Sequence, residues 1–200
     1  TGQGMYASQA RVAGLRARVA RMQGQSEQER AYLVSILSSA PEYVGLYATE
    51  LLDSYRKLGR GDEGVAMLRS HYQKHPSLDI FNVLFRVLRE QQGHLQAWAF
   101  ARDALRAHPS LLGLDKMLEV ELQDQGQNKE GAEGAAAVGV DQIIAGADLS
   151  LLRSLIHRHT QRLDRYSCRS CGFEARHFYW QCPGCNSWET YAPRRLEELK

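Results

Sequence analysis

Four cysteines near the C-terminus form two pairs, each with two residues between the thiols: Cys168, Cys171, Cys182 and Cys185. The sequence contains no other cysteine. Two intervening residues let both sulfurs of a pair turn toward one point, so two facing pairs supply four thiolates at tetrahedral corners, the geometry that zinc or a single iron ion accepts. Gly172 and Asn186 follow the pairs, where such turns often need a residue that tolerates positive φ. The spacing predicts one closed metal site.

Other uses of these cysteines are less favoured. Structural disulfides belong to secreted proteins, and we recognise no signal peptide in the chain. A redox-active pair normally lies singly at the start of a helix in a βαβ unit. His177 lies between the pairs and could replace a thiol, but four well-spaced cysteines leave it no vacancy. We therefore expect four sulfur ligands and a reducing, cytoplasmic environment.

Composition and charge limit the function classes. Two hundred residues, 44% hydrophobic and 24% charged, suffice for one ordinary domain and a small appendage. The net charge of +2 argues against a dedicated polyanion binder. No apolar run approaches the roughly 20 residues of a membrane helix. No nucleophile–base pair, phosphate loop or open metal site is recognisable, so we expect a protein that is not an enzyme.

The chain ahead of the cysteines has the pattern of a helical repeat. Segments 51–76 and 81–109 each predict two amphipathic helices with a glycine-containing turn between them, and each ends in His-Pro. Their terminal prolines, Pro76 and Pro109, lie 33 positions apart. This resembles the tetratricopeptide repeat, whose period is about 34 residues. A solenoid of such repeats typically uses its concave face to bind proteins or peptides.

Residue size along the repeats predicts how the helices pack. Small residues stand where the helices of this repeat cross closely: Gly64, Ala97, Ala101 and Ala104. Tyr55 and Leu88 are expected in the core. Leu52 and Phe85 occupy a position where the repeat usually has a small residue. We expect this exchange to change the helix packing but not the architecture.

Helical periodicity continues upstream of these repeats. Residues 10–22 and 27–37 predict another helix pair. Ser26 and Glu29 have the spacing of a capping box, in which two side chains satisfy backbone groups at the start of a helix. We therefore expect the second helix of this pair to begin with that box.

Downstream, 111–123 predicts the first helix of a further repeat, glycines then interrupt the pattern, and 149–163 is helical again. Within the glycine-rich stretch, 135–144 has weak helical character. The predicted division of the chain is 1–124 tetratricopeptide-like repeats, 125–147 Gly/Ala-rich connection, 148–165 bridging helix, 166–193 four-cysteine module and 194–200 tail.

Aromatic residues surround the cysteines: Phe173, Phe178, Trp180, Trp188 and Tyr191. They favour strands, in a module too small to build an ordinary core. A bound metal must then supply much of the folding free energy, on the order of 10 kcal/mol. We favour shielding of the sulfurs as the role of these aromatics over docking onto the repeats or another protein, although the two roles are compatible.

Tetratricopeptide-like helices followed by Arg165-Tyr-Ser-Cys-Arg-Ser-Cys-Gly-Phe173 and Phe178-Tyr-Trp-Gln-Cys-Pro-Gly-Cys-Asn-Ser-Trp188 form a distinctive combination. It resembles the lipopolysaccharide assembly protein B family of Gram-negative bacteria, most strongly over 165–193 and moderately over 51–122. The resemblance implies an all-α solenoid of tetratricopeptide-like helical hairpins with a small C-terminal rubredoxin-like or zinc-ribbon β module. It also implies one bound metal ion, for which iron is favoured and zinc is the alternative. The implied ligands are Cys168, Cys171, Cys182 and Cys185.

The same resemblance implies a regulator of lipopolysaccharide synthesis. Such a protein promotes degradation of the deacetylase that commits the cell to lipid A, by a membrane-bound AAA+ protease. The implied partners are this deacetylase, the protease and an inner-membrane regulator protein, with lipopolysaccharide as a further candidate. The implied place is the cytoplasmic face of the inner membrane, attached through a segment outside this sequence. A rubredoxin-like electron-transfer protein and a zinc-ribbon nucleic-acid-binding module are the alternatives.

Overall fold

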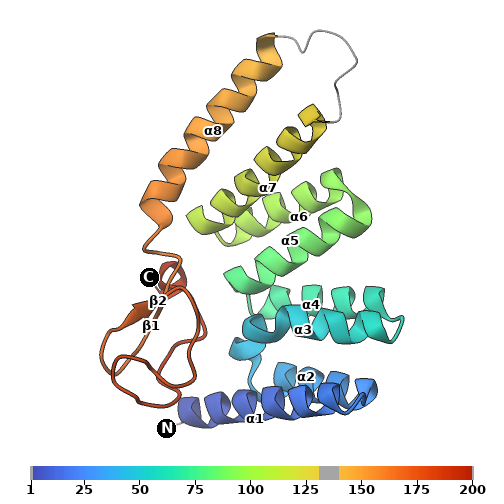
Figure 1. Cartoon of the computed structure of the whole chain (residues 1–200), viewed down its shortest axis with the longest axis vertical. Coiled ribbons are helices and arrows are strands. Elements are labelled where there is room, and N and C mark those ends of the chain that lie inside the picture. The colour runs from blue at the N-terminus through green and yellow to red at the C-terminus, as the bar shows by residue number, and fades with distance from the viewer. Residues whose placement is uncertain (1, 131–139, 200) are drawn as a thin grey trace.

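The computed structural model describes residues 2–130 and 140–199, and over these residues the chain forms a stack of α-helices with a small module beside it (Figure 1). The helices are α1 (Gly2–Met22), α2 (Ser26–Ser39), α3 (Val44–Lys57), α4 (Gly61–Lys74), α5 (Leu78–Gln92), α6 (His94–Ala107), α7 (Leu111–Glu130) and α8 (Val140–Thr160). Consecutive helices pack on each other, and α5 also contacts both α3 and α7. This stacking of helix pairs is that of a solenoid, so the predicted fold class is confirmed for the helical part.

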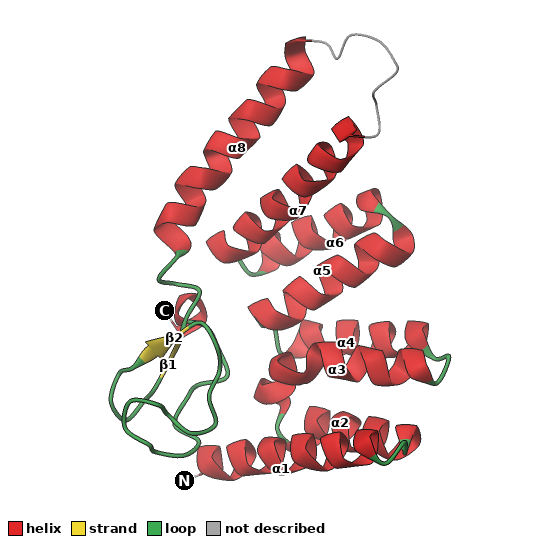
Figure 2. Cartoon of the chain, viewed as in Figure 1, coloured by secondary structure: helices red, strands yellow, loops and turns green. Residues whose placement is uncertain are grey.

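The module is built mostly from loops. Its two strands, β1 (Tyr166–Ser167) and β2 (Glu174–Ala175), pair antiparallel. Two short 3-10 helices complete the described elements: η1 (Pro41–Tyr43), which precedes α3, and η2 (Leu196–Leu199), in the C-terminal tail. Figure 2 shows the module lying alongside the helical stack rather than beyond its last helix. None of the helices in the described part of the chain is long and apolar enough to cross a membrane.

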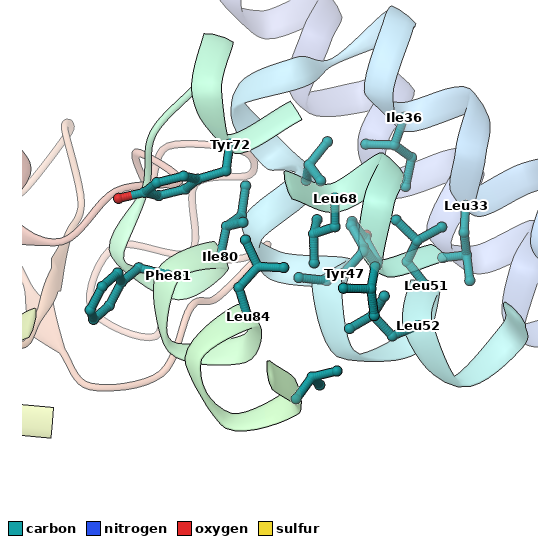
Figure 3. Packing of buried hydrophobic residues seen from close by; sticks show 14 of the residues in the cluster. Leu33, Ile36, Tyr47, Leu51, Leu52, Leu68, Tyr72, Ile80, Phe81 and Leu84 are labelled. Carbon is teal, nitrogen blue, oxygen red and sulfur yellow. The ribbon is translucent and has the colours of Figure 1, made fainter. Parts of the chain in front are cut away.

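The two aligned repeats form the helix pairs α3–α4 and α5–α6, and their large core residues interlock (Figure 3). Leu52 and Phe85, the bulky residues at the small-residue position, are both buried, each with only 2% of its surface exposed. Ala97 and Ala101 are completely buried, as expected for close helix crossings. The exchange of small for bulky residues therefore leaves the predicted architecture in place.

Gly64 lies at another close crossing, and Gly64→Ala is expected to destabilise the solenoid by about 1 kcal/mol. A Cβ at this position would lie 2.9 Å from Cβ and Cγ of Tyr55, which is completely buried and cannot move aside. Overpacking costs about 1–3 kcal/mol, partly offset by the better helix propensity of alanine. Urea unfolding measures the difference. In the same helix, Gly61→Ala meets only an ordinary contact of 3.6 Å with Arg56 and is not expected to destabilise the solenoid.

The predicted capping box at Ser26 is wrong. Gln25 is the N-cap of α2 and no side chain caps that helix end. Glu29 instead accepts hydrogen bonds from Arg21 on α1, at 2.6 Å, and from Lys57 on α3, at 3.0 Å. Only 1% of the Glu29 side chain is exposed, and a buried carboxylate requires charged partners. The hydrogen bonds from α1 and α3 to Glu29 therefore replace the predicted local cap.

This buried carboxylate predicts a pH dependence of stability. Burial raises the pKa of Glu29, but the hydrogen bonds from Arg21 and Lys57 outweigh it, so its pKa is below the ordinary 4.5. A group whose pKa is lower in the folded chain stabilises the fold above its unfolded pKa and loses that effect as the pH falls through its folded pKa. Glu29→Gln should therefore remove about 1–3 kcal/mol at neutral pH.

The same substitution should flatten the fall in the free energy of unfolding below pH 4.5. Urea unfolding across a pH series measures this. Glu27→Gln on the same helix changes an exposed carboxylate and serves as the control, with a pH profile close to that of the unsubstituted protein. Parallel profiles for Glu29→Gln and the unsubstituted protein would contradict the expectation.

The helix ends differ from those predicted. Helix α1 begins at Gly2 rather than at residue 10. Helix α7 continues to Glu130 and α8 already begins at Val140, although 125–147 was expected to be a connection; residues 131–139 of that connection lie outside the described residues. A glycine inside a helix costs only about 1 kcal/mol, and packing of α7 against α8 offsets that cost. The domain boundaries of the chain stay predictions.

Candidate metal centre

The two cysteine pairs form turns of the same construction. The amide of Gly172 donates to the carbonyl of Cys168 at 2.9 Å, and the amide of Asn186 donates to that of Cys182 at 2.8 Å. Gly172 has φ of 76° and Asn186 has φ of 59°. Both residues therefore adopt the left-handed conformation expected from their positions after each pair.

The sulfur positions fit one tetrahedral metal ion. The sulfurs of Cys168 and Cys185 are 3.8 Å apart and those of Cys171 and Cys182 are 3.7 Å apart. All four lie within 4.8 Å of one another. Metal–sulfur bonds of about 2.3 Å in a tetrahedron place the sulfurs about 3.8 Å apart. The structure thus brings the four predicted ligands together, and His177 lies outside their cluster; their assignment as ligands stays a prediction.

The surroundings of the sulfurs favour a thiolate at Cys168. Burial raises the pKa of this thiol, but hydrogen bonds from Thr190 and from backbone amides outweigh it and lower the pKa to about 6. At Cys171 the amide of Phe173 lowers the pKa, whereas burial and the neighbouring sulfurs raise it to about 12. Four adjacent thiols cannot all ionise without a cation, because like charges repel. A metal ion would supply that cation and release the remaining protons.

The module has very little apolar core of its own. The buried residues that form its hydrophobic cluster are Tyr166, Cys168, Cys182 and Tyr191, so two of these four are cysteines. Tyr191 has only 1% of its surface exposed and lies in the ladder position opposite Cys168. Shielding of the sulfurs, the favoured role of the aromatic residues, therefore describes Tyr191. A core this small is consistent with folding that depends on a bound metal.

Other aromatic residues of the module contact the repeats, and Phe178 among them also packs within the module. The ring of Trp180 stacks on Tyr43 of η1, with centroids 5.8 Å apart, and Phe178 meets Tyr43 edge-on at 6.5 Å. Trp188 lies beneath the guanidinium of Arg11 on α1, 5.0 Å from its centre. Aromatic pairs contribute about 0.5–1.5 kcal/mol beyond the burial of their area. Docking onto the repeats, the less favoured role, describes these three side chains.

Polar contacts fasten the module at two further points. Near α1, Glu189 accepts hydrogen bonds from Ser8 and Arg11; Glu189 has φ of 58°, an uncommon conformation for glutamate. At the start of α5, one oxygen of Asp79 accepts from the hydroxyl of Tyr166, two residues before Cys168. The other oxygen of Asp79 accepts from Arg195, at 2.8 Å.

Arg195 was not predicted to have a role, because the tail carried no recognisable motif. Its guanidinium bonds Asp79 and Asp164 and lies 4.5 Å from the centre of the Tyr166 ring. Burial lowers the pKa of Arg195, but Asp79, Tyr166 and Asp164 outweigh it and raise that pKa. Arg195 therefore joins the solenoid, the segment before the module and the module itself. A feature of the sequence that could have pointed to this role is the clustering of charge in the tail, where two arginines are followed by two glutamates.

Comparisons with known proteins agree with this geometry. Residues 166–193 match the family model of the rubredoxin metal binding domain. The chain is 24% identical over 190 residues to lipopolysaccharide assembly protein B of Haemophilus influenzae, a match that covers 94% of this chain and 44% of that protein. The chain thus spans less than half the length of this relative. Both findings point the same way: the chain is similar to lipopolysaccharide assembly protein B over its helical repeats and the module docked on them.

Proposed function

We propose that this chain is a non-enzymatic adaptor that regulates lipopolysaccharide assembly through protein–protein contacts. The observation that carries the proposal is the docking of the four-cysteine module on the solenoid, by Trp180 and Phe178 against Tyr43 and by Arg195 with Asp79. Such contacts give the four-cysteine module a structural role, as part of a surface for partner proteins. The name of the Haemophilus relative, an assembly protein for lipopolysaccharide, supports the same role.

In its specific form, the proposal is that the adaptor promotes turnover of the deacetylase that commits the cell to lipid A. The partners are then this deacetylase, a membrane-bound AAA+ protease and an inner-membrane regulator protein, at the cytoplasmic face of the inner membrane. A solenoid supports this role because it offers an extended binding surface. A closed site of four sulfurs supports it because such a site has no free coordination position for a substrate.

The test measures the half-life of the deacetylase in two kinds of cell. One produces the unsubstituted protein, and the other produces the protein with Cys182→Ser. We expect the half-life of the deacetylase to be several-fold longer in the cells with the variant. Pull-downs of the variant from membranes should also contain less protease and less deacetylase. His177→Ala, an exposed change within the same module, is the matched control and should behave like the unsubstituted protein. An unchanged half-life with the metal lost would refute a role for the module.

The metal itself separates the adaptor from an electron-transfer protein. Residues Cys168, Cys171, Cys182 and Cys185 would hold the ion, which we propose to be iron, with zinc as the alternative. An iron held by four thiolates absorbs visible light and is a one-electron couple, whereas zinc has no redox chemistry. We expect the zinc-loaded protein to retain partner binding and deacetylase turnover. Loss of both on zinc loading would instead favour electron transfer.

A further inference from the structure

The tail reaches back to the start of α7. A carboxylate oxygen of Glu197 accepts from the amide of Leu111 at 2.8 Å, and the other accepts from the hydroxyl of Ser110 at 2.6 Å. The amide of Leu112 lies 3.3 Å from the same carboxylate. The first amides of a helix have no partner within that helix and carry partial positive charge. Glu197 therefore caps α7 from the other end of the chain.

The next residue does the same for α5. One oxygen of Glu198 accepts from the amide of Leu78, the first residue of α5, at 2.8 Å. Its other oxygen accepts from the amide of Arg195, also at 2.8 Å. Glu198 is half-buried, and this burial raises its pKa although both amides lower it. Two consecutive residues thus cap two helices that contact each other.

The tail is itself fastened to the segment that enters the module. The amide of Leu196 donates to the carbonyl of Arg165 at 2.8 Å, and Arg195 bonds both the carbonyl and the carboxylate of Asp164. The two ends of the module are therefore held together beside α5, and everything between them is the four-cysteine unit. The fold of that unit decides whether its two ends stay together, because an unfolded loop must be closed at an entropic cost.

We propose that residues 194–199 form a latch through which metal loading of the four-cysteine site holds the first turns of α5 and α7 at a fixed spacing. Loading folds the module, the folded module keeps the latch beside Asp164 and Arg165, and the latch places Glu197 and Glu198 on the two helices. Loss of the metal frees the latch and removes the tail carboxylates from both helix starts together, while Ser77 and Ser110 keep their own local cap bonds. The solenoid surface thus responds to the metal site, which goes beyond the proposed adaptor function and does not depend on it.

Hydrogen exchange of the intact, metal-loaded protein tests the latch. Glu197→Ala combined with Glu198→Ala should speed exchange of the first amides of α5 and α7 about tenfold. The metal content should not change, since neither residue touches a sulfur. Glu174→Gln, which removes a carboxylate of the module that pairs with the exposed Arg162, is the matched control and should leave both helix starts unchanged.

Chelation then distinguishes the latch from a local cap. In the unsubstituted protein, removal of the metal should speed exchange at the same two helix starts as well as within the module. In the double variant, chelation should speed exchange within the module but add nothing at the helix starts. The proposal is overturned if chelation leaves the helix starts of the unsubstituted protein unchanged, or if it accelerates them equally in both proteins. These readouts are independent of deacetylase turnover, so the latch and the proposed function can fail separately.

Discussion

Cys182→Ser is expected to release the metal and unfold the module while the repeats remain helical. Cys182 is completely buried and its sulfur lies 3.7 Å from that of Cys171. A hydroxyl replaces one of four thiolates poorly, and metal binding contributes on the order of 10 kcal/mol to folding in such modules. The remaining buried residues of the module are too few to replace that contribution.

Metal analysis and circular dichroism measure the two halves of this expectation. The metal content should fall from one ion per chain to almost none, while the helical signal should fall only slightly because the module has two short strands and no long helix. His177→Ala should keep both the metal and the signal. Full metal occupancy in Cys182→Ser would contradict the assignment of the ligands, and loss of most of the helical signal would contradict the independence of the repeats.

Asp79→Ala is expected to have the second largest effect, a loss of about 3 kcal/mol in the free energy of unfolding. The substitution removes the acceptor of both Tyr166 and Arg195. Only 17% of the Arg195 side chain is exposed, and a buried charge left without a partner costs about 3–5 kcal/mol. Asp164 still pairs with Arg195, which places the expected loss at the lower end of that range.

Urea unfolding of the metal-loaded protein measures this loss. Arg56→Ala provides the control, because it breaks pairs with Asp53 and Glu90 that are largely exposed and worth less than about 1 kcal/mol each. Adding Arg195→Met to Asp79→Ala should restore part of the stability, since no unpaired charge then remains buried. A loss below 1 kcal/mol for Asp79→Ala alone would show that the network does not fasten the module.

The four-cysteine cluster could be predicted from the sequence because its constraints are local. Two residues between thiols determine the turn, and the turn requires positive φ at the next residue, which the structure shows at Gly172 and Asn186. The helix pairs were predictable for a similar reason. The repeat period and the small residues of the helix crossings record contacts that recur from one repeat to the next, and Ala97 and Ala101 are completely buried as expected.

Local patterns failed where a distant partner competed for the same side chain. Ser26 and Glu29 have the spacing of a capping box, but Glu29 is taken by Arg21 and Lys57 from neighbouring helices. The aromatic residues show the same limit. Composition favoured shielding of the sulfurs, whereas Trp180 stacks on Tyr43, far away in the sequence.

The sequence by itself determined the main features of this protein: four cysteines in one cluster, attached to a solenoid of helix pairs. Only the tertiary structure decided how the two parts are joined. Asp79 meets Arg195, and Glu197 caps α7, across more than eighty residues. Single ion pairs and caps of this kind leave no periodic pattern in the sequence, because their partners are adjacent only once the chain has folded.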